Sequence, residues 1–511
     1  MASRLRNRYL FTTRQKLLAA LVALVLVGVP LGWGIDKWTT PEDRSCAPGV
    51  ERPQGSDECV GVNGSGFAFG VPQLAEIAGL IGHENGVLKE GKYVTVAILL
   101  PFTSTDPGMR AKVLHELQGS YARQYWENNK ANGRTPKIRL VLANTGNENV
   151  HWERVVQQLK GMTGAPDRLR AVSGVATSSP EIRSSVAALT KAKIAVVGTT
   201  ITADDIANGP DHNDFPGLAR VSPTNNDEAR ALPLGKVDAG RTLIVQDTRT
   251  DDHYTNTLKA AFATALKGRT PYEPAVFTSP PDSTAEGTTS NIFNKIASRV
   301  CETQSETVLF AGRHTQLRQF INELGERGCA ARSSVTVLTG DEGSYLGSDP
   351  KLDRKALTAR LTVRYAALAH PDAWRAATNP TLPKTGGSEA DYDTFLEAVS
   401  HASQKPVPLG DGQAIIAYDA VATAVHAIRE AAQGKPYPEP SDVGQQWPQV
   451  TGELQRVNGA SGWICLDNYG NPFNKAVPIV SLTPKGTQRF ESIAWPEGKA
   501  PTPNCLKPNP Q

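Results

Sequence analysis

An alternation of apolar runs with amphipathic helical segments constrains the fold of this chain more than any other feature. It starts at "KYVTVAILLPF" (residues 92–102), whose apolar run is too continuous for an exposed strand, and continues to "KIAVVGTT" (residues 193–200). The same alternation restarts at "RTLIVQDT" (residues 241–248) and runs to "SSVTVLTGD" (residues 333–341). Strands that alternate with helices form parallel sheets whose two faces are both covered. The sequence therefore predicts an α/β fold with two doubly wound parallel-sheet lobes.

The length of 511 residues agrees with more than one lobe, because single cores rarely grow beyond about 250–300 residues. After the second alternation come a loop-rich stretch, one strongly apolar helix and short antiparallel strands. We therefore divide the chain beyond its N-terminal region as follows: first lobe, residues 92–240; second lobe, residues 241–365; return to the first lobe, residues 366–460; hinge and second-lobe strands, residues 461–495; proline-rich tail, residues 496–511.

The N-terminal region has the pattern of a membrane anchor. Residues 1–16 carry five basic side chains and no acidic one, and residues 17–35 form an uncharged run of nineteen residues. A helix of about 20 apolar residues spans a bilayer core, whereas the apolar core of a cleaved signal peptide has about 7–15. We predict an uncleaved transmembrane signal-anchor over residues 17–35, with a cleaved signal peptide as the alternative.

This anchor fixes the expected topology. The basic tail of residues 1–16 holds the N-terminus in the cytoplasm, so everything after Ile35 lies outside the cell. Residues 36–91 are then a juxtamembrane spacer that contains a disulfide, and the lobes belong to a single-pass protein of the cell membrane.

The charge of the chain argues against nucleic-acid binding. The formal net charge is +3, but residues 1–16 contribute +5, so the remaining 495 residues sum to −2. A nucleic-acid surface needs a basic excess on the folded part, and here the excess lies only in the tail. We expect no nucleic-acid partner.

All six cysteines lie beyond the predicted span, in a compartment where an even number of cysteines indicates disulfides. Cys46 and Cys59 are close in sequence. Cys301 and Cys329 each stand six residues before a predicted strand start, at Thr307 and Val335, and Cys465 and Cys505 remain. The predicted pairs are Cys46–Cys59, Cys301–Cys329 and Cys465–Cys505. A zinc site is the alternative, although there is no C-x-x-C pair and the nine histidines are scattered. We expect no metal and no cofactor.

A hydroxyl-rich loop, "SGVATSSPEI" (residues 173–182), follows one predicted strand of the first lobe. It lacks the G-x-S-x-G pattern of a hydrolase nucleophile turn and the glycine and lysine pattern of a phosphate-binding loop. Ser179 stands where a helix N-cap belongs, with Pro180 at the first helical position. The stretch is therefore interpreted as the rim of a ligand pocket, without a catalytic residue.

The next predicted strand ends in a similar loop, "VVGTTIT" (residues 196–202). The carboxyl ends of parallel strands meet at one edge of the sheet, which is where open α/β sheets bind ligands. A predicted donor cluster results, made of Ser178, Ser179, Thr199 and Thr200. The alternative is that these are ordinary turn and capping residues.

Between about residues 92 and 482 the chain contains an ordered series of segments: "VAILLPFTSTDPG", "LQGSYARQYWENN", "SGVATSSPEI", "KIAVVGTTITADDI", "FPGLARVSPTNNDEARAL", "AIIAYDAVATAVHAI" and "GASGWICLDNYGNP". This series resembles a known family, the type I periplasmic binding proteins, and in particular the branched-chain amino-acid-binding group of ABC-transporter solute receptors. The resemblance implies a Venus-flytrap arrangement, in which two lobes joined by a multi-strand hinge close on a ligand.

The same resemblance suggests what each site residue does. In the first lobe, the hydroxyl cluster named above matches the residues that hold the ligand's carboxylate and polar end. Asn225 lies at the crossing between lobes, where the family usually has an acidic residue, and Tyr254 falls at a Tyr-Gly position, with Thr255 in place of the glycine. His314 and Asp341 (or Glu342) end successive strands of the second lobe, so the edge argument places them facing the cleft.

The expected function is therefore that of a membrane-anchored extracellular solute-binding protein, which is not an enzyme. It captures a small polar ligand, an amino acid or a similar molecule, for an ABC permease or a signalling partner. The alternative is a sensory or protein-interaction ectodomain that uses the same fold without solute transport. Besides Thr255, three features depart from the family: a predicted transmembrane anchor replaces a lipid anchor, Asn225 replaces an acid, and the "TSTDPG" loop lacks the usual glycine after its threonine.

Overall fold

The computed structural model describes residues 44–131, 133–282 and 285–505. The predicted basic tail and signal-anchor, residues 1–16 and 17–35, lie outside the described residues. None of the helices in the described part has the length and apolar character that a membrane span requires. The chain from Cys46 onward forms one unit, and both main sheets described below belong to it.

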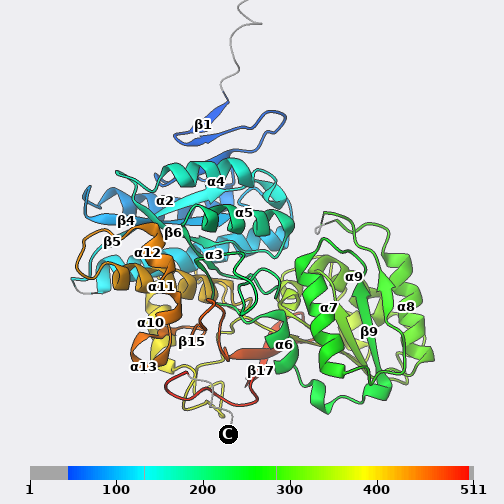
Figure 1. Ribbon diagram of the computed structural model, residues 1–511. Helices are drawn as coiled ribbons and strands as arrows, with labels where there is room; N and C mark the ends of the chain where they lie inside the picture. Colours follow the sequence, from blue (N-terminus) through cyan, green and yellow to red (C-terminus); the bar gives the residue numbers. More distant parts are fainter. Residues whose placement is uncertain (1–43, 132, 283–284, 506–511) are drawn as a thin grey trace, which may run out of the picture. The chain divides into compact units, whose positions relative to one another are not determined.

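The first lobe is built on an eight-stranded sheet with the strand order β1-β2-β3-β5-β4-β6-β7-β8. Of its strands, Figure 1 labels β1, β4, β5 and β6. Five neighbouring strands in the sheet are parallel and follow the order 2-1-3-4-5 along the chain, a common doubly wound order. These strands are β4 (Tyr93–Leu100), β5 (Lys137–Asn144), β6 (Leu169–Gly174), β7 (Ala195–Gly198) and β8 (Leu218–Arg220).

Three short strands extend this sheet at the β5 edge: β1 (Ser45–Ala47), β2 (Val50–Glu51) and β3 (Val60–Asn63). β3 pairs antiparallel with β5, and β2 pairs antiparallel with β3. Helix α2 (Ala75–Gly86) follows and packs against β5. From Cys46 on, the segment predicted as a spacer therefore contributes strands and a helix to the first lobe.

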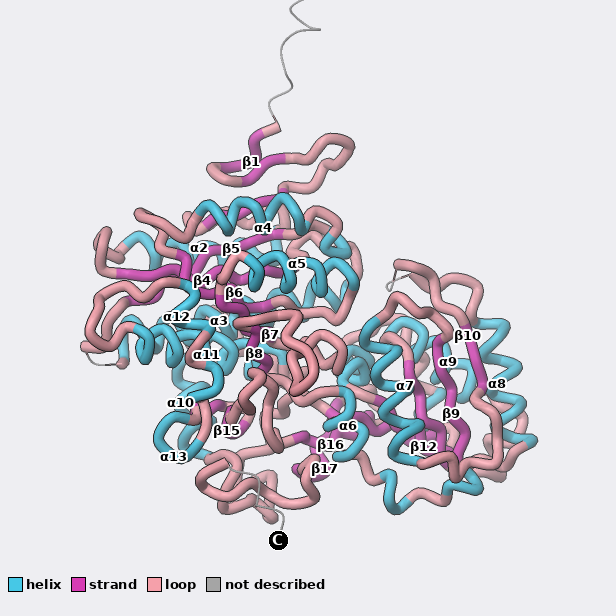
Figure 2. Tube along the Cα trace, viewed as in Figure 1, coloured by secondary structure: helices cyan, strands magenta, loops and turns pink. Residues whose placement is uncertain are grey.

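The second lobe has a seven-stranded sheet with the order β10-β9-β11-β12-β13-β16-β17 (Figure 2). Its first five strands are parallel and repeat the 2-1-3-4-5 order, and the last two are antiparallel. The strands are β9 (Thr242–Asp247), β10 (Ala275–Phe277), β11 (Thr307–Ala311), β12 (Val335–Thr339), β13 (Leu361–Ala366), β16 (Val477–Leu482) and β17 (Gln488–Ala494). The predicted pair of doubly wound lobes is thus confirmed.

Helices connect the parallel strands and cover the sheets (Figure 2). In the first lobe they are α3 (Pro107–Tyr125), α4 (Trp152–Gly161), α5 (Pro180–Lys191), α10 (Glu389–Val399), α11 (Gln413–Ala431), α12 (Pro440–Gly444) and α13 (Gly452–Gln455). In the second lobe they are α7 (His253–Leu266), α8 (Ser290–Glu302) and α9 (His314–Gly325). The short helix α6 (Asn225–Ala231) follows β8 and packs against α7.

The chain crosses between the two lobes three times. It leaves the first sheet after β8, returns after β13 to form α10 and α11, and enters the second sheet again at β16. A small sheet of β14 (Val457–Gly459) and β15 (Gly462–Ile464) precedes the last crossing. Three crossings provide the multi-strand hinge that the resemblance implies.

Helix α11 is mostly apolar and is sandwiched between α3 and the first sheet. Asp419 is a buried charged residue within it. Its carboxylate accepts hydrogen bonds from the backbone N–H groups of Ala460 and Ser461, at 2.7 and 2.8 Å, and thereby holds the turn between β14 and β15. The buried Lys475 ammonium donates to the Ser461 carbonyl oxygen at 2.6 Å and completes this polar anchor.

Several local expectations are also confirmed. Strands β11 and β12 start at the predicted residues, Thr307 and Val335. The structure forms all three predicted disulfides, Cys46–Cys59, Cys301–Cys329 and Cys465–Cys505.

Candidate ligand-binding site between the two lobes

A cavity of about 410 Å³ lies where the carboxyl ends of the parallel strands of both sheets face each other. The first lobe lines it with the loops after β4, β5 and β6, which contribute Pro101, residues 147–150, Thr177 and residues 179–181. The second lobe lines it with the loops after β9, β10, β11 and β12, which contribute Arg249, residues 251–252, residues 281–282, residues 313–314 and Glu342. The cavity therefore lies at the sheet edges where the sequence predicts the site.

Helix α5 begins at this cavity. Ser179 is its N-cap, with a side-chain oxygen that accepts a hydrogen bond from the Ile182 N–H at 3.3 Å, and Pro180 is the first helical residue. Both residues line the cavity, and Thr177 lines it beside them. The predicted helix start is thus confirmed, and it brings Ser179 to the cavity wall.

The other three residues of the predicted hydroxyl cluster lie behind the cavity wall. The Ser178 hydroxyl accepts a hydrogen bond from the Ala203 N–H at 3.2 Å. The Thr199 hydroxyl lies 2.8 Å from a Glu116 carboxylate oxygen, and the Thr200 hydroxyl lies 2.5 Å from the Ala176 carbonyl oxygen. These hydroxyls therefore make internal contacts in this structure.

Lys112 on α3 is a buried residue that the sequence analysis missed. Its ammonium donates to the Ala176 carbonyl oxygen at 2.6 Å and to the Thr200 hydroxyl at 2.7 Å. One helical turn along, the Glu116 carboxylate lies 3.8 Å from the same ammonium. Burial raises the pKa of Glu116 to about 7, although the Lys112 charge acts in the opposite direction. The i, i+4 spacing of Lys112 and Glu116 in the predicted helix was the available signal.

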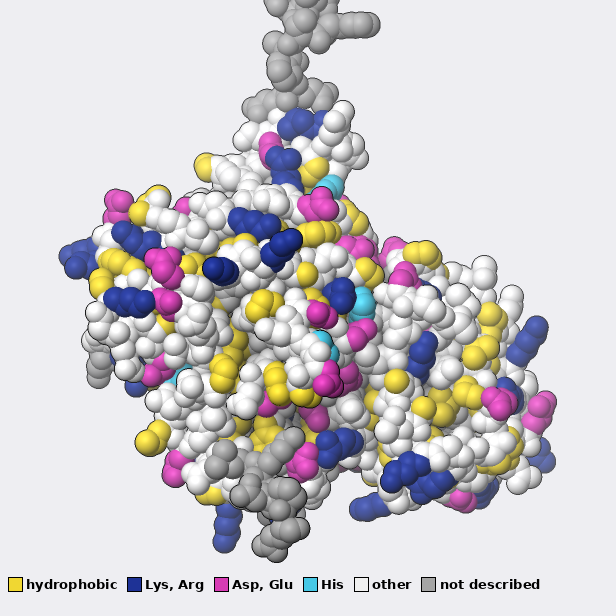
Figure 3. All heavy atoms as spheres, viewed as in Figure 1, with side chains coloured by type: hydrophobic (Ala, Val, Ile, Leu, Met, Phe, Trp, Pro, Cys, Tyr) yellow, Lys and Arg dark blue, Asp and Glu magenta, His cyan; other side chains and the backbone are white. Residues whose placement is uncertain are grey.

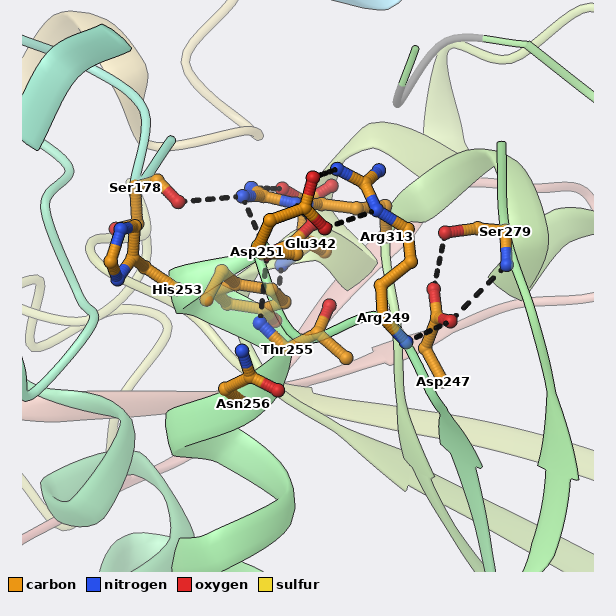
Figure 4. Close-up of polar contacts among 12 residues, drawn as sticks. Ser178, Asp247, Arg249, Asp251, His253, Thr255, Asn256, Ser279, Arg313 and Glu342 are labelled. Atoms are coloured by element: carbon orange, nitrogen blue, oxygen red, sulfur yellow. Dashed lines mark hydrogen bonds and ion pairs between the residues drawn. The ribbon is translucent and has the colours of Figure 1, made fainter. Parts of the chain in front are cut away.

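Arg313, also missed, is the central charged residue of the second-lobe wall (Figure 4). Its guanidinium lies 2.8 Å from the Asp252 carboxylate and 2.9 Å from the Glu342 carboxylate. The same group donates to the Ser178 carbonyl oxygen of the first lobe at 3.0 Å and lies 4.8 Å above the Tyr254 ring. Arg313 thus joins two second-lobe loops and bridges to the first lobe.

His314 lines the cavity beside Arg313 and stacks on the Tyr345 ring at 4.4 Å. Its Nδ1 lies 2.7 Å from the Glu342 carboxylate, and its Nε2 lies 3.6 Å from the Asp106 carboxylate of the first lobe. Burial lowers the pKa of His314, but the contact with Glu342 and the negative charges of Asp106 and Glu342 outweigh burial and raise the pKa to about 9. His314 is therefore an imidazolium at neutral pH.

Glu342 is the carboxylate that pairs with both Arg313 and His314. Burial raises its pKa, but the hydrogen bond and charge of His314 and the charge of Arg313 outweigh burial and hold the pKa well below its usual range. The wall is therefore a network of paired charges, in which one carboxylate serves both a guanidinium and an imidazolium.

The remaining predicted residues, Asn225, Tyr254 and Asp341, are buried and do not line the cavity. The Asn225 amide donates to the Tyr254 carbonyl oxygen at 2.8 Å and to the Thr257 hydroxyl at 2.7 Å, which ties α6 to α7. The Asp341 N–H donates to the buried Glu228 carboxylate at 3.0 Å, and burial with a neighbouring carboxylate raises the pKa of Asp341 to about 7. Of the eight predicted ligand-binding residues, Ser179 and His314 are the two that line the 410 Å³ cavity.

The sequence matches no protein-family model and no curated protein. Its structure, in contrast, is similar to those of several solute-binding proteins. The leucine-binding protein LivK of Thermotoga maritima has a TM-score of 0.58 and 17% sequence identity, over 79% of this chain and 99% of that one. The substrate-binding protein LivJ of Streptococcus pneumoniae, in complex with isoleucine, has a TM-score of 0.54 and 13% identity, over 79% and 99% of the two chains.

A third similar structure binds a different class of compound. It is the solute-binding protein of an ABC transporter from Rhodopseudomonas palustris, in complex with 4-hydroxybenzoate, with a TM-score of 0.55 and 14% identity over 79% of this chain and 96% of that one. At these identities the likeness shows the fold and leaves the ligand open. From the two repeated sheets, the three crossings and these likenesses, we conclude that this chain has the fold of the type I periplasmic binding proteins.

Proposed function

We propose that this protein is a solute-binding protein that captures a small polar ligand between its two lobes. The N-terminal segment, residues 17–35, anchors it in the cell membrane with the lobes outside, and an ABC permease or a signalling partner recognises the closed form. The membrane anchor and this topology rest on the apolar run and the basic tail of the sequence.

The cavity between the lobes is the observation that carries this proposal. Its volume of about 410 Å³ lies within the range of roughly 300–1,000 Å³ that is usual for small-molecule sites. The α5 start with Ser179 forms one wall, and the loop carrying Arg313 and His314 forms the other. A ligand that touches both walls binds the closed form more tightly than the open form and so shifts the population toward closure.

The proposed mechanism contains no catalytic step. The hydrolase alternative needs a nucleophile beside a base, whereas Ser179 uses its side-chain oxygen as a helix cap and His314 is paired with two carboxylates. Binding, lobe closure and recognition by a partner are sufficient for this function.

Thermal shift and native mass spectrometry of the full-length protein in detergent test the proposal. A panel of amino acids, peptides, sugars and aromatic acids is screened, and a co-purified small molecule is sought. We expect a hit whose thermal shift is lost in Ser179→Ala. Ser388→Ala is the matched control, because Ser388 caps α10 in the same way outside the cavity. Each variant loses an N-cap worth about 1 kcal/mol, so the two substitutions destabilise the protein to a similar extent. If both variants lost the ligand-induced thermal shift equally, the proposed site would be contradicted.

One observation favours the second candidate, a sensory or protein-interaction ectodomain. Contacts within the protein itself already join the lobes: Arg313 with the Ser178 carbonyl oxygen at 3.0 Å, and His253 with Asp205 at 2.7 Å. If the ligand panel stays silent and small-angle scattering shows closed lobes in its absence, the sensory function is favoured over solute capture.

A further inference from the structure

We propose that the cavity between the lobes takes a cationic ligand that also presents a hydrogen-bond acceptor, of the chemical class of arginine and other basic amino acids. This inference rests on the proposed solute-binding function and names the class of solute. Three observations carry it: the charge of the lining, the internal pairing of its cations, and one buried donor without a partner.

The cavity lining has a strong excess of negative charge. Seven carboxylates line it, against two guanidinium groups and the imidazolium of His314, which leaves four negative charges in excess. The first lobe contributes three of these carboxylates, Glu58, Glu148 and Glu181. Among the described residues that line the cavity, the first lobe supplies no lysine or arginine.

The two guanidinium groups of the second lobe are already neutralised by their own lobe (Figure 4). Arg313 lies between Asp252 and Glu342, at 2.8 and 2.9 Å. Arg249 makes a two-pronged contact with Asp251, at 2.9 and 3.1 Å. Because each guanidinium is engaged by a carboxylate of the same lobe, neither balances the carboxylates on the opposite wall.

Glu58 shows how the first-lobe charge is held at the cavity. It precedes Cys59, whose disulfide with Cys46 closes the loop before β3. Its carboxylate accepts hydrogen bonds from the Thr103 hydroxyl and from the Asn147 N–H, the latter at 2.7 Å. Both donors are neutral, so they fix the position of the carboxylate and leave its charge uncompensated.

Glu181 adds a second such charge in the first turn of α5. Among the described residues it forms no ion pair, and it lines the cavity beside the helix start. A cation placed between Glu58 and Glu181 would supply the opposite charge that the protein does not provide there. A neutral ligand would leave both carboxylates partly desolvated without a partner, which is unfavourable.

The required acceptor follows from His314. The His314 side chain is only 8% exposed and lines the cavity, and its Nε2 makes no hydrogen bond, since the carboxylate of its ion-pair partner Asp106 lies 3.6 Å away. A buried N–H without an acceptor is costly, so a ligand oxygen is expected to satisfy it. A basic amino acid carries both features, since its carboxylate can accept from His314 while its side-chain cation faces the acidic wall.

Isothermal titration calorimetry of the full-length protein in detergent tests this inference with three matched probes. Arginine carries both the cation and the carboxylate, citrulline has the same shape without the side-chain charge, and agmatine keeps the cation without the carboxylate. We expect arginine to bind at least about tenfold more tightly than citrulline, which corresponds to one charge-assisted contact, and more tightly than agmatine. Leucine and glutamate serve as neutral and anionic references.

Substitutions of single acidic residues test which carboxylates contact the cationic group of the ligand. Glu58→Gln and Glu181→Gln are each expected to weaken arginine binding about fivefold to tenfold and to leave citrulline binding unchanged. Glu153→Gln is the matched control, because Glu153 occupies the first turn of the neighbouring helix α4 and lies outside the cavity. Thermal unfolding of each variant checks that it is folded.

The outcomes separate this inference from the proposed function. If citrulline, leucine or glutamate binds as tightly as arginine, the cationic class is wrong while solute binding stands. If Glu153→Gln weakens arginine binding as much as Glu58→Gln does, the acidic wall is not the contact and the inference fails. If neither these probes nor the wider panel binds, solute capture itself fails, and the inference fails with it.

Discussion

Gly119 marks the closest approach of two helices behind the cleft, and replacing it gives a sharp test of the fold. It lies in α3, the helix that carries Lys112, and faces the start of α11. A Cβ atom at this position would lie 2.0 Å from the carbonyl oxygen of Ala414 and 2.8 Å from its carbonyl carbon. These are backbone atoms of a buried helix, so they cannot move aside as the end of a flexible side chain could.

The size of the effect follows from two opposing contributions. Replacing glycine by alanine in a helix interior gains about 1 kcal/mol of helix propensity. Overpacking a tight interface costs typically about 1–3 kcal/mol, and a clash with backbone belongs at the upper end or above it. We therefore expect Gly119→Ala to lower the free energy of unfolding by about 2 kcal/mol.

Gly79→Ala is the matched comparison. Gly79 lies in the interior of α2, and a Cβ atom there meets no other atom within 4 Å. Only the propensity gain applies, so this variant is expected to be more stable than the parent by about 1 kcal/mol. Urea unfolding followed by far-UV circular dichroism measures both. Equal stability of the two variants would refute the close approach of α3 and α11.

Three further predictions concern the cleft and its surroundings. Arg313→Met leaves the buried Glu342 carboxylate without its guanidinium and should lower the free energy of unfolding, measured in urea, by about 3–5 kcal/mol. A loss below about 1 kcal/mol would mean that the pair is not buried as described. Burial raises the pKa of Glu116 from 4.5 to about 7, so its ionisation in the unfolded state removes stability as the pH rises from about 4.5 through 7. Glu116→Gln should flatten this pH dependence, which urea midpoints at pH 5 and pH 8 would show, and an unchanged slope would contradict it. Replacing Cys465 and Cys505 by serine opens a loop with a sequence separation of 40 residues and should lower the free energy of unfolding by about 4 kcal/mol. A reduced parent protein that is as stable as the oxidised one would contradict this prediction.

The sequence was sufficient to predict the architecture because the architecture depends on local patterns. Strand and helix periodicities do not require knowledge of distant contacts, and their repetition predicts two doubly wound sheets. The N-cap at Ser179 and the strand starts at Thr307 and Val335 are local in the same sense. The disulfide between Cys301 and Cys329 followed from these strand starts, since neighbouring parallel strands bring equivalent positions together.

The composition of the site was less predictable because it depends on where side chains point. The edge rule places Ser178, Thr199 and Thr200 at the correct edge of the sheet, yet their hydroxyls make internal contacts. Nothing local to residue 200 indicates that Lys112, 88 positions earlier, donates to that threonine. The predicted residues Asn225, Tyr254 and Asp341 likewise make internal contacts and do not line the cavity.

Arg313 illustrates the remaining difficulty. It directly precedes the predicted residue His314, and its importance comes from Asp252 and Glu342, which lie on two other loops. Sequence patterns identify the loops that meet at an edge, but the pairing of charges among them follows only from the folded structure. Glu58 was missed because its segment had been interpreted as a spacer, whereas β3 incorporates that segment into the first sheet.

The antiparallel pairing of β3 with β5 also determines how the molecule would respond to mechanical tension. Any force applied to the chain ahead of Cys46 reaches the first lobe through the Cys46–Cys59 bridge and then through the β3–β5 ladder. If the chain is anchored as we propose, the first lobe would be the stationary body, and the second lobe, joined to it by three crossings, would make the larger excursion in the proposed closure. Because Glu58 is adjacent to that bridge and lines the cavity, tension on the chain ahead of Cys46 would act directly on the proposed binding site.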